Sequence, residues 1–264
     1  LPALANALAD ASPVIAFGCS AHLLDRHTDT FQEMDQVRLM EPATKWAAQL
    51  THPHKLAEFV STGFRKALAA PQGPVYLDLP ADVAEQGPPI DEMVARLPAK
   101  YRTDSRPLAD PALTREAIDL LAKADKPLIF AGSGVLWSKA SDELTGFAEL
   151  TGIPFYTTPQ SRGVIPEDRA GFFGGARSMA FREADVVLVV GTRPNIIPTF
   201  FRPPRWRDDV KLIVVNLDPE VIGLNAPVEV GLYGDAKAVL QQLISDAQGR
   251  FQPGETEWTK SLAD

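Results

Sequence analysis

Residues 186–193 read Val-Val-Leu-Val-Val-Gly-Thr-Arg, and this stretch decides the fold. Five successive apolar residues, four of them β-branched, are typical of a strand that is buried on both faces of a parallel sheet. Gly191 then marks the point where the strand gives way to a loop. The run falls far short of the roughly 20 apolar residues that a membrane-spanning helix requires. The stretch therefore predicts an interior strand of a helix-covered sheet.

Outward from this strand, short apolar runs alternate with amphipathic stretches along the chain. The stretch at residues 110–124 has leucines and alanines on one face at helical spacing. Strands are predicted at residues 13–17, 75–79, 127–131, 154–157, 186–191 and 211–216, and helices at residues 54–69, 110–124, 139–150 and 235–247. This alternation is typical of a mostly parallel sheet covered by helices, so the predicted fold class is α/β.

A polar, proline-containing segment at residues 88–107 has no clear period, so it predicts a linker between two units. The second unit, residues 108–250, has the size and the strand–helix rhythm of a complete domain. The first, residues 1–87, has too few strands and would leave a sheet edge and a sheet face uncovered, so we interpret it as the C-terminal half of a domain. Because the chain begins at Leu1 without a signal-peptide pattern and ends in a polar tail at residues 251–264, we expect a piece of a longer polypeptide.

The composition excludes several classes of function. The 264 residues include 26 Lys and Arg against 34 Asp and Glu, which gives a formal net charge of −8. Proteins that bind a phosphate backbone concentrate basic residues, so nucleic acid is not expected as a partner. Cys19 is the only cysteine, which excludes an intrachain disulfide and a cysteine zinc cluster. Without a membrane-spanning run or a signal peptide, we expect a cytoplasmic protein with no membrane partner.

A glycine motif follows one of the predicted strands. Gly132 and Gly134 flank Ser133 between a strand and a helix, the context in which glycines let the backbone approach a phosphate group. The motif is not a Rossmann fingerprint, because Trp137 stands where the third glycine belongs and the next strand ends without a ribose-binding acid. The alternative is a tight turn that needs glycine for its backbone conformation alone.

The loops that follow the other predicted strands of the second unit, or precede its helices, carry similar residues. In an open α/β sheet the loops at the carboxyl ends of the strands lie along one crevice, where ligands bind. Arginines there suit phosphates, backbone groups suit an adenine and aspartate suits a ribose, so we predict a nucleotide-like ligand. The candidate residues beyond the glycine motif are Thr157, Thr158, Gly174, Gly175, Arg177, Gly191, Arg193, Asn216, Leu217, Gly234 and Asp235. The alternative is that glycine and aspartate are simply common at strand-to-helix turns.

In the first unit, a long polar loop at residues 18–36 follows a predicted strand, and loops of this kind often carry binding groups. His27 could move a proton near neutral pH, with a solvated surface histidine as the alternative. Glu33 and Asp35 do not share a helical face, so no metal site is predicted from them. The chain contains no G-x-S-x-G, H-E-x-x-H or P-loop lysine motif, and no self-contained catalytic constellation is visible.

Several segments taken together resemble a known family. Residues 29–33 read Asp-Thr-Phe-Gln-Glu, and residues 73–83 read Gly-Pro-Val-Tyr-Leu-Asp-Leu-Pro-Ala-Asp-Val. They resemble the second half of the pyrimidine-binding domain of thiamine diphosphate enzymes, in the group of acetolactate synthase (acetohydroxyacid synthase) with benzaldehyde lyase and oxalyl-CoA decarboxylase. Residues 126–134, 184–193 and 216–219 resemble the Rossmann-like central domain of that family. The matching segments span nearly the whole chain and occur in the same order and spacing as in the family.

This resemblance implies a thiamine-diphosphate-dependent 2-keto acid decarboxylase or carboligase, with thiamine diphosphate and Mg²⁺ as cofactors of the full-length parent. The substrate would be a 2-keto acid or an acyl-CoA, and the assembly a homodimer or homotetramer. Phe31 and Gln32 match the family's active-site wall, while Ala81 stands where the synthases often carry a lysine. The family's catalytic glutamate and its G-D-G…N motif are absent from this sequence, so the chain alone is expected to be inactive.

The resemblance also leaves alternatives. Some family members hold FAD or ADP in the central domain, and Arg193 matches the first arginine of the synthase pattern. Both acids and the second arginine of that pattern are replaced here, which argues against tight FAD binding. One alternative is an enzyme similar to oxalyl-CoA decarboxylase or benzaldehyde lyase. The other is a free-standing FAD- or ADP-binding module without catalysis.

Overall fold

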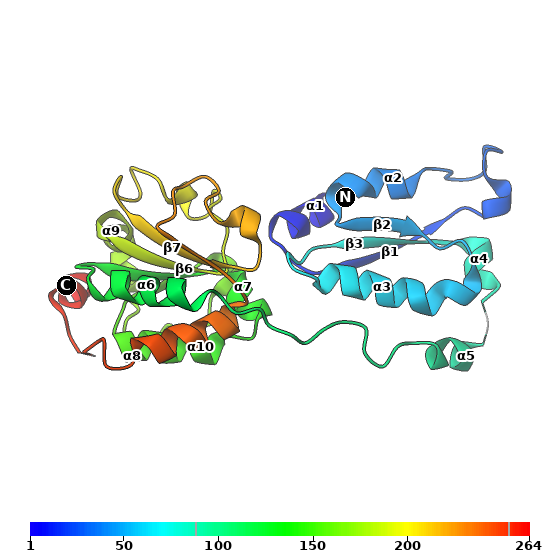
Figure 1. The fold of residues 1–264 in the computed structure, drawn as a ribbon. Coiled ribbons are helices and arrows are strands. Elements are labelled where there is room, and N and C mark those ends of the chain that lie inside the picture. The colour runs from blue at the N-terminus through cyan, green and yellow to red at the C-terminus, as the bar shows by residue number, and fades with distance from the viewer. Residues whose placement is uncertain (88, 253) are drawn as a thin grey trace. The chain divides into compact units, whose positions relative to one another are not determined.

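The computed structural model describes residues 1–87, 89–252 and 254–264. The chain divides into two compact units, unit 1 (Leu1–Asp104) and unit 2 (Ser105–Asp264). The boundary falls inside the predicted linker, which also contains a short helix, α5 (Ile90–Ala95). Residue 88 of that linker and residue 253 of the predicted tail lie outside the described residues. Each unit has its own parallel sheet (Figure 1), so each is treated as a separate α/β body.

Unit 1 is built on a three-stranded parallel sheet in the order β1-β3-β2. The strands are β1 (Ile15–Ser20), β2 (Trp46–Gln49) and β3 (Val75–Pro80). Its other elements are α1 (Pro2–Ala9), η1 (Leu23–Asp25), α2 (Gln36–Met40), η2 (Glu41–Ala43), η3 (Pro53–Lys55), α3 (Leu56–Leu68) and α4 (Ala81–Glu85). Helix α3 covers one face of the sheet, and α1 and α2 lie over the other (Figure 1).

The sheet of unit 1 is incompletely covered along β1. Phe17 points to the face that carries α3, yet 55% of it remains exposed, whereas Leu77 on the central strand is fully buried. Gly63 of α3 explains the close packing at the centre, because a Cβ there would lie 3.1 Å from Leu77 Cδ1. Strand β1 is an edge strand of the sheet, and the interpretation of unit 1 as half of a domain stays a prediction. The strand predicted at 13–17 runs instead from Ile15 to Ser20.

Unit 2 has a five-stranded parallel sheet in the order β5-β4-β6-β7-β8. Its strands are β4 (Pro127–Ala131), β5 (Phe155–Thr157), β6 (Val186–Val190), β7 (Lys211–Asn216) and β8 (Val230–Tyr233). Its helices are α6 (Pro111–Ala122), α7 (Ser133–Trp137), α8 (Ser141–Thr151), α9 (Arg177–Glu183), α10 (Ala236–Ala247) and α11 (Glu257–Ala263), with 3-10 turns η4 (Pro159–Ser161), η5 (Gly174–Ala176), η6 (Thr199–Phe201) and η7 (Pro219–Val221).

The run that opened the sequence analysis becomes β6, the central strand, and every one of its residues is buried. Its side chains alternate between two cores. Val186, Leu188 and Val190 join the core under α6, α8 and α10, while Val187 and Val189 join an aromatic core that includes residues of α9 and α11. Burial on both faces is the reason that five apolar residues occur in succession. The α/β class predicted from the sequence is confirmed.

Strands β2 and β8 were not predicted, and neither were the shorter helices, among them α9 and α11. Strand β2 reads Trp-Ala-Ala-Gln, which has little β propensity, and it is held by pairing with β3. Residues 251–264, interpreted as a polar tail, contain α11, whose Trp258 and Leu262 are buried against unit 2. Trp258 Nε1 also donates to the carbonyl of Pro127 at 3.1 Å. Two apolar side chains one turn apart are enough to dock a short helix.

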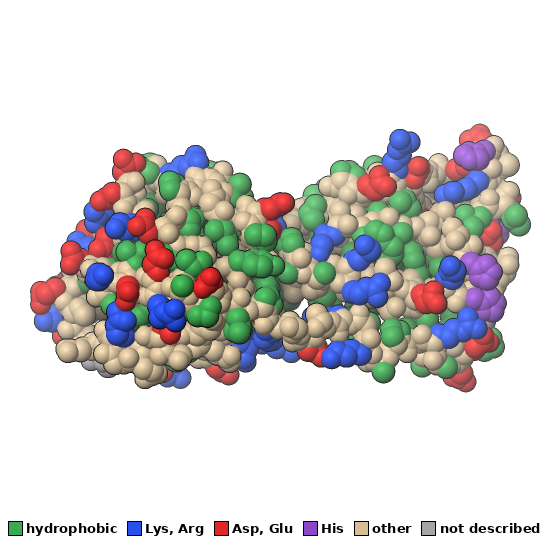
Figure 2. All heavy atoms as spheres, in the orientation of Figure 1, with side chains coloured by type: hydrophobic (Ala, Val, Ile, Leu, Met, Phe, Trp, Pro, Cys, Tyr) green, Lys and Arg blue, Asp and Glu red, His purple; other side chains and the backbone are tan. Residues whose placement is uncertain are grey.

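Among the described residues, no helix combines the length and apolar character needed to cross a bilayer. The face shown in Figure 2 carries acidic and basic side chains intermixed over both units, without a continuous basic surface among the described residues.

Candidate functional site

The strands of unit 2 are all parallel, so their carboxyl ends share one edge of the sheet. The predicted ligand residues follow β4, β5, β6, β7 and β8 at this edge, or precede α9. The packing there is tightest between the segments after β4 and β6. A Cβ on Gly134 would lie 2.6 Å from Gly191 Cα, and one on Gly132 would lie 2.3 Å from Thr192 Cβ.

This contact decides what the glycine motif does. The Gly132 amide donates to Val190 O and the Gly134 amide donates to Gly191 O, both at 2.8 Å. Gly191 itself has a left-handed backbone, with φ at 63°. The glycines therefore let two loops touch backbone to backbone, and both amides are already hydrogen-bonded within the protein. Neither Gly132 nor Gly134 has a left-handed backbone, so the motif serves close packing of two loops rather than the tight turn given as the alternative. Because both amides are engaged, they offer no free donor to a phosphate.

The threonines after β5 are also engaged locally. Thr158 N donates to Ala131 O at 2.9 Å, and Thr158 Oγ1 lies 2.8 Å from Ser161 Oγ. Ser161 Oγ in turn donates to Ala131 O at 2.8 Å. Thr157 is buried beside them. These contacts fasten the end of β5 to the end of β4.

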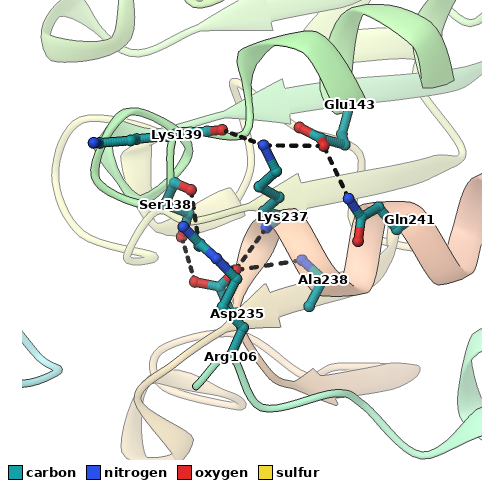
Figure 3. A network of polar contacts seen from close by, with 8 residues as sticks. All are labelled: Arg106, Ser138, Lys139, Glu143, Asp235, Lys237, Ala238 and Gln241. Atoms are coloured by element: carbon teal, nitrogen blue, oxygen red, sulfur yellow. Dashed lines mark hydrogen bonds and ion pairs between the residues drawn. The ribbon is translucent and has the colours of Figure 1, made fainter. Parts of the chain in front are cut away.

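Asp235 lies in a polar network that joins α10 to two other segments (Figure 3). The buried carboxylate of Asp235 accepts from Arg106 at 2.8 Å and from Ser138 Oγ at 2.9 Å. It also caps α10 by accepting from the backbone amides of Lys237 and Ala238. A Cβ on Gly234 would lie 3.1 Å from backbone atoms of residues 107 and 109. Asp235 thus has four donors inside the unit, which gives it a structural task.

The same network continues on the side of α10 that faces α8. Lys237 Nζ lies 3.2 Å from Glu143 Oε1 and donates to Lys139 O at 3.3 Å. Gln241 Nε2 also donates to Glu143 Oε1, at 3.0 Å (Figure 3). The network therefore holds α10, α8 and the segment before α6 as one body.

Arg193 follows β6 and lies beside Asp218, which follows β7, with 3.7 Å between their charged atoms. The side chain of Arg193 is about one-third exposed, so it faces solvent at the edge where a ligand would bind. Asn216 links the two loops, because its Nδ2 donates to Thr192 O and its Oδ1 accepts from the Asp218 amide. Leu217 lies between these two polar residues. This part of the predicted site keeps a charged group accessible.

A second cation, the partly buried Arg177, lies at the start of α9 beside the exposed Arg205. The Arg177 guanidinium is 5.2 Å from the centroid of the Phe181 ring, and the Arg205 guanidinium is 5.3 Å from the same centroid. Neither forms an ion pair within the described part of the chain, and Arg177 Nε is buried without a hydrogen-bond partner there. Burial lowers the pKa of Arg177, and the positive charge of Arg205 lowers it further. Such a pair favours an anion between or beside the two side chains.

The sequence analysis named Arg177 but missed Arg205. Arg205 follows two prolines in the long loop between β6 and β7, and its neighbour Trp206 stacks on Phe181 with 4.4 Å between ring centroids. The signal available in the sequence was the run Arg-Pro-Pro-Arg-Trp-Arg at residues 202–207. Gly174 and Gly175, at the start of the same region, are exposed, and a Cβ on Gly175 would meet no atom within 4 Å.

In unit 1, the predicted wall residues lie on the loop at residues 21–35. Phe31 is 84% exposed, and Gln32 is exposed with a left-handed backbone, φ 59°. The loop closes on itself where the His27 amide donates to Glu33 Oε1 at 2.6 Å, and this bond holds the pKa of Glu33 below its usual range. Both predicted wall side chains therefore project from a shaped loop into solvent. Within the described residues, no group of three or more His, Cys, Asp or Glu side chains is placed to hold a metal ion.

Comparison with known proteins assigns this architecture. Residues 114–243 match the family model described as the thiamine pyrophosphate enzyme central domain. The chain is 35% identical over 248 residues to a 2-hydroxyacyl-CoA lyase of Oryza sativa subsp. japonica, an alignment that covers 91% of this chain and 43% of that protein. It is 34% identical over 256 residues to a probable acetolactate synthase large subunit of Methanocaldococcus jannaschii, covering 92% and 42% of the two chains.

An oxalyl-CoA decarboxylase of Escherichia coli (strain K12) is 31% identical over 248 residues, covering 93% of this chain and 44% of that enzyme. The chain therefore spans less than half the length of the curated relatives it matches. The crystal structure of benzoylformate decarboxylase from Polynucleobacter necessarius aligns with a TM-score of 0.74 at 21% identity, over 97% of this chain and 48% of that one. This last similarity shows the fold.

Proposed function

Because the chain belongs to the thiamine pyrophosphate enzymes, through the central-domain family matched by unit 2, we propose that it is part of a thiamine-pyrophosphate-dependent lyase or decarboxylase. The observation that carries the proposal is that single relatives align with both units in one continuous stretch. Both units therefore derive from one kind of enzyme rather than from unrelated proteins joined together.

The described residues do not by themselves fit the cofactor. They include no cluster of metal ligands that could hold Mg²⁺ beside a diphosphate. The loop at residues 21–35 of unit 1 presents Phe31 and Gln32, which could contact a ligand but could not hold a metal ion or a diphosphate. Thiamine pyrophosphate, when bound, supplies an electron sink for bonds next to a carbonyl group. We propose that other parts of a longer protein hold it, and we derive no chemical step through it from this chain.

Within that enzyme, Phe31 and Gln32 are proposed to wall the substrate site. Their support is exposure: an apolar ring and an amide project side by side from a loop that the protein shapes. An apolar surface excludes water from a reacting centre, and an amide can orient a carboxylate or carbonyl of the substrate by hydrogen bonding. A homodimeric or homotetrameric assembly and a cytoplasmic location, both expected from the sequence, belong to the same proposal.

For the substrate, we favour an acyl-CoA over a free 2-keto acid. Arg205 is exposed, Arg193 is about one-third exposed and Arg177 is partly buried beside Arg205, and the phosphates of a CoA nucleotide would neutralise their charges. Two of the relatives named above carry an acyl-CoA in their names. An acetolactate-synthase-like enzyme that acts on free 2-keto acids is the second candidate, favoured by the similarity to the archaeal synthase subunit.

The test uses the full-length protein with thiamine pyrophosphate and Mg²⁺, supplied with oxalyl-CoA, a 2-hydroxyacyl-CoA or pyruvate. Arg205→Met keeps the apolar stem and removes the charge, so KM for the CoA substrate should rise about tenfold, the effect of losing one hydrogen bond to a charged group. Arg169→Met is the matched control, because Arg169 is exposed and paired with Glu149. Turnover of pyruvate alone, or an unchanged KM in Arg205→Met, would reject the acyl-CoA assignment.

The non-catalytic alternative, binding of ADP or FAD by unit 2, has narrower support. Arg193 beside Asp218 remains available to a nucleotide, whereas the amides of Gly132 and Gly134 and the carboxylate of Asp235 are already engaged. Calorimetric titration of the chain with ADP and with FAD separates the cases. Tight binding of either nucleotide by the chain alone would support the module, and no binding would remove it.

A further inference from the structure

The loop at residues 21–35, which presents Phe31 and Gln32, has an unusual backbone. His27, Asp29 and Gln32 all adopt left-handed φ values, between 59° and 67°. Residues other than glycine adopt this conformation uncommonly, although Asp and His do so more readily than Gln. Besides its internal bond between His27 and Glu33, the loop is fastened from outside, by Asp82 of α4 and by Gln36 of α2 together with Tyr76 of β3.

The first fastening point is Asp82, the second residue of α4. This buried carboxylate accepts from the Leu23 amide at 3.0 Å through Oδ2 and from the Val83 amide at 2.9 Å through Oδ1. Burial opposes its ionisation, but the backbone amides of Leu23, Val83 and Leu24 outweigh burial and keep the pKa of Asp82 below its usual value. The start of the loop is thus tied to α4, directly after β3, by a charged acceptor.

The second fastening point is Gln36, the first residue of α2, directly after the loop. Its Oε1 accepts from Tyr76 Oη on β3 at 2.5 Å, and its Nε2 donates to Cys19 O on β1 at 3.1 Å. One amide side chain therefore joins the end of the loop to two neighbouring strands. The Gly18 position makes the contact possible, because a Cβ there would lie 1.9 Å from Tyr76 Oη.

Tyr76 is itself held in place by Asp78, which is 1% exposed. Asp78 accepts from Ser20 Oγ at 2.8 Å and Gln49 Nε2 at 2.5 Å, and its Oδ1 lies 3.4 Å from Tyr76 Oη. Burial first, and then the charge of Asp78, raise the pKa of Tyr76 to about 12. The phenol keeps its proton across the neutral range, and the shorter bond directs that proton to Gln36.

We infer that Asp82 at one end and the Tyr76–Gln36 pair at the other are positioning residues, which fix the loop at residues 21–35 and so set the direction of Phe31 and Gln32. None of the three residues belongs to the loop: Asp82 lies on α4, Tyr76 on β3 and Gln36 at the start of α2. The inference rests on the proposed function, because it matters to catalysis only if Phe31 and Gln32 face the substrate.

The test has two independent measurements. The first is hydrogen–deuterium exchange of the chain, read at peptides covering residues 21–35. Asp82→Asn replaces one acceptor by a donor, and Gln36→Met removes the link to Tyr76 while leaving Asp78 bonded to Ser20 and Gln49. Each should speed exchange in the loop by about tenfold, the effect of one hydrogen bond, without change in β4 or β6. Glu85→Gln, an exposed carboxylate on the same short helix α4, is the control.

Gln36→Met also serves if Asp82→Asn fails to fold, because Gln36 is only half-buried. Unchanged exchange of the loop in a folded Gln36→Met variant overturns the inference. Faster exchange in the control Glu85→Gln to the same extent overturns it too, because the effect would then not depend on the fastening contacts.

The second measurement is turnover by the full-length holoenzyme carrying Gln36→Met, Gln32→Ala or both. If Gln36 acts through the loop, Gln36→Met lowers kcat several-fold in the parent and has little further effect beside Gln32→Ala. Faster exchange with turnover unchanged in all three variants keeps the fastening of the loop but removes the active-site role of Phe31 and Gln32. The failure of the inference and the failure of the proposed function therefore give different results.

Discussion

The two units of this chain use buried groups in opposite ways. In unit 2 the central strand is apolar on both faces, and the polar groups at the strand ends are paired with one another across the loops. In unit 1 the sheet has three strands, Phe17 on the edge strand β1 is 55% exposed, and the most deeply buried side chains include Asp78. Unit 2 has two apolar cores, whereas unit 1 has an apolar core under α3 and a buried polar cluster around Asp78. The difference places the buried polar contacts of unit 1 beside the loop at residues 21–35.

The contrast also explains why similar residue types have different tasks. Asp235 in unit 2 and Asp82 in unit 1 are both buried carboxylates at the start of a helix. Asp235 fastens α10 to the body of its own unit, through Arg106 and Ser138. Asp82 fastens a loop whose tip is exposed. A buried carboxylate is therefore informative about function only together with what it holds.

The largest expected effect compares the two cores directly. Phe130 of β4 is fully buried and contacts the rings of Phe181 and Trp206. Phe130→Ala should lower the free energy of unfolding of unit 2 by about 3–5 kcal/mol, and Phe17→Ala should cost unit 1 less than about 1 kcal/mol because the ring is already exposed. Urea titration with hydrogen exchange and mass spectrometry reports each unit separately. Similar losses in the two units would contradict the comparison.

An intermediate effect tests the contact between loops in unit 2. Gly134→Ala places a methyl group 2.6 Å from Gly191 Cα, so the backbones must separate, at a cost of about 1–3 kcal/mol. Gly175→Ala is the matched control, because a Cβ there meets nothing within 4 Å. Thermal unfolding of both variants measures the difference. A Gly134→Ala protein as stable as the control would contradict the close contact between the two loops.

The smallest effect concerns alkaline pH and has the same sign in both units. Burial is the main cause that raises the pKa of Tyr76 in unit 1 and of Tyr156 in unit 2, each to about 12. A raised pKa in the folded state means that the stabilisation is present below pH about 10, the unfolded value, and is lost as the pH rises to about 12.

Tyr76→Phe should therefore flatten the fall in stability of unit 1 between these pH values and leave that of unit 2 unchanged. Tyr156→Phe is the reciprocal control, expected to act on unit 2 alone. Urea midpoints at pH 8 and pH 11, read by hydrogen exchange in each unit, make the comparison. A pH dependence that stays the same in Tyr76→Phe would show that other groups carry it.

The sequence by itself predicted the class of fold, most strands of unit 2, the long helices and the family. These features depend on patterns within a few neighbouring residues, and burial on both faces leaves such a pattern in β6. The elements missed from sequence, such as β2 and α11, have weak local patterns and are held by partners elsewhere in the chain. The candidate loops were also found, because strand ends are marked by glycine, threonine and aspartate.

Only the tertiary structure decided what those loop residues do. Whether the Gly134 amide is free depends on Gly191, in a distant part of the sequence, and whether the Asp235 carboxylate is free depends on Arg106, 129 residues away. The position of Arg205 over the Phe181 ring likewise depends on a contact between separate segments of the chain. An apolar run identifies a buried strand because solvent exclusion acts on each residue separately. A free donor or acceptor is defined by the partner within about 3 Å of it, and distant chain segments supply that partner only when the protein folds.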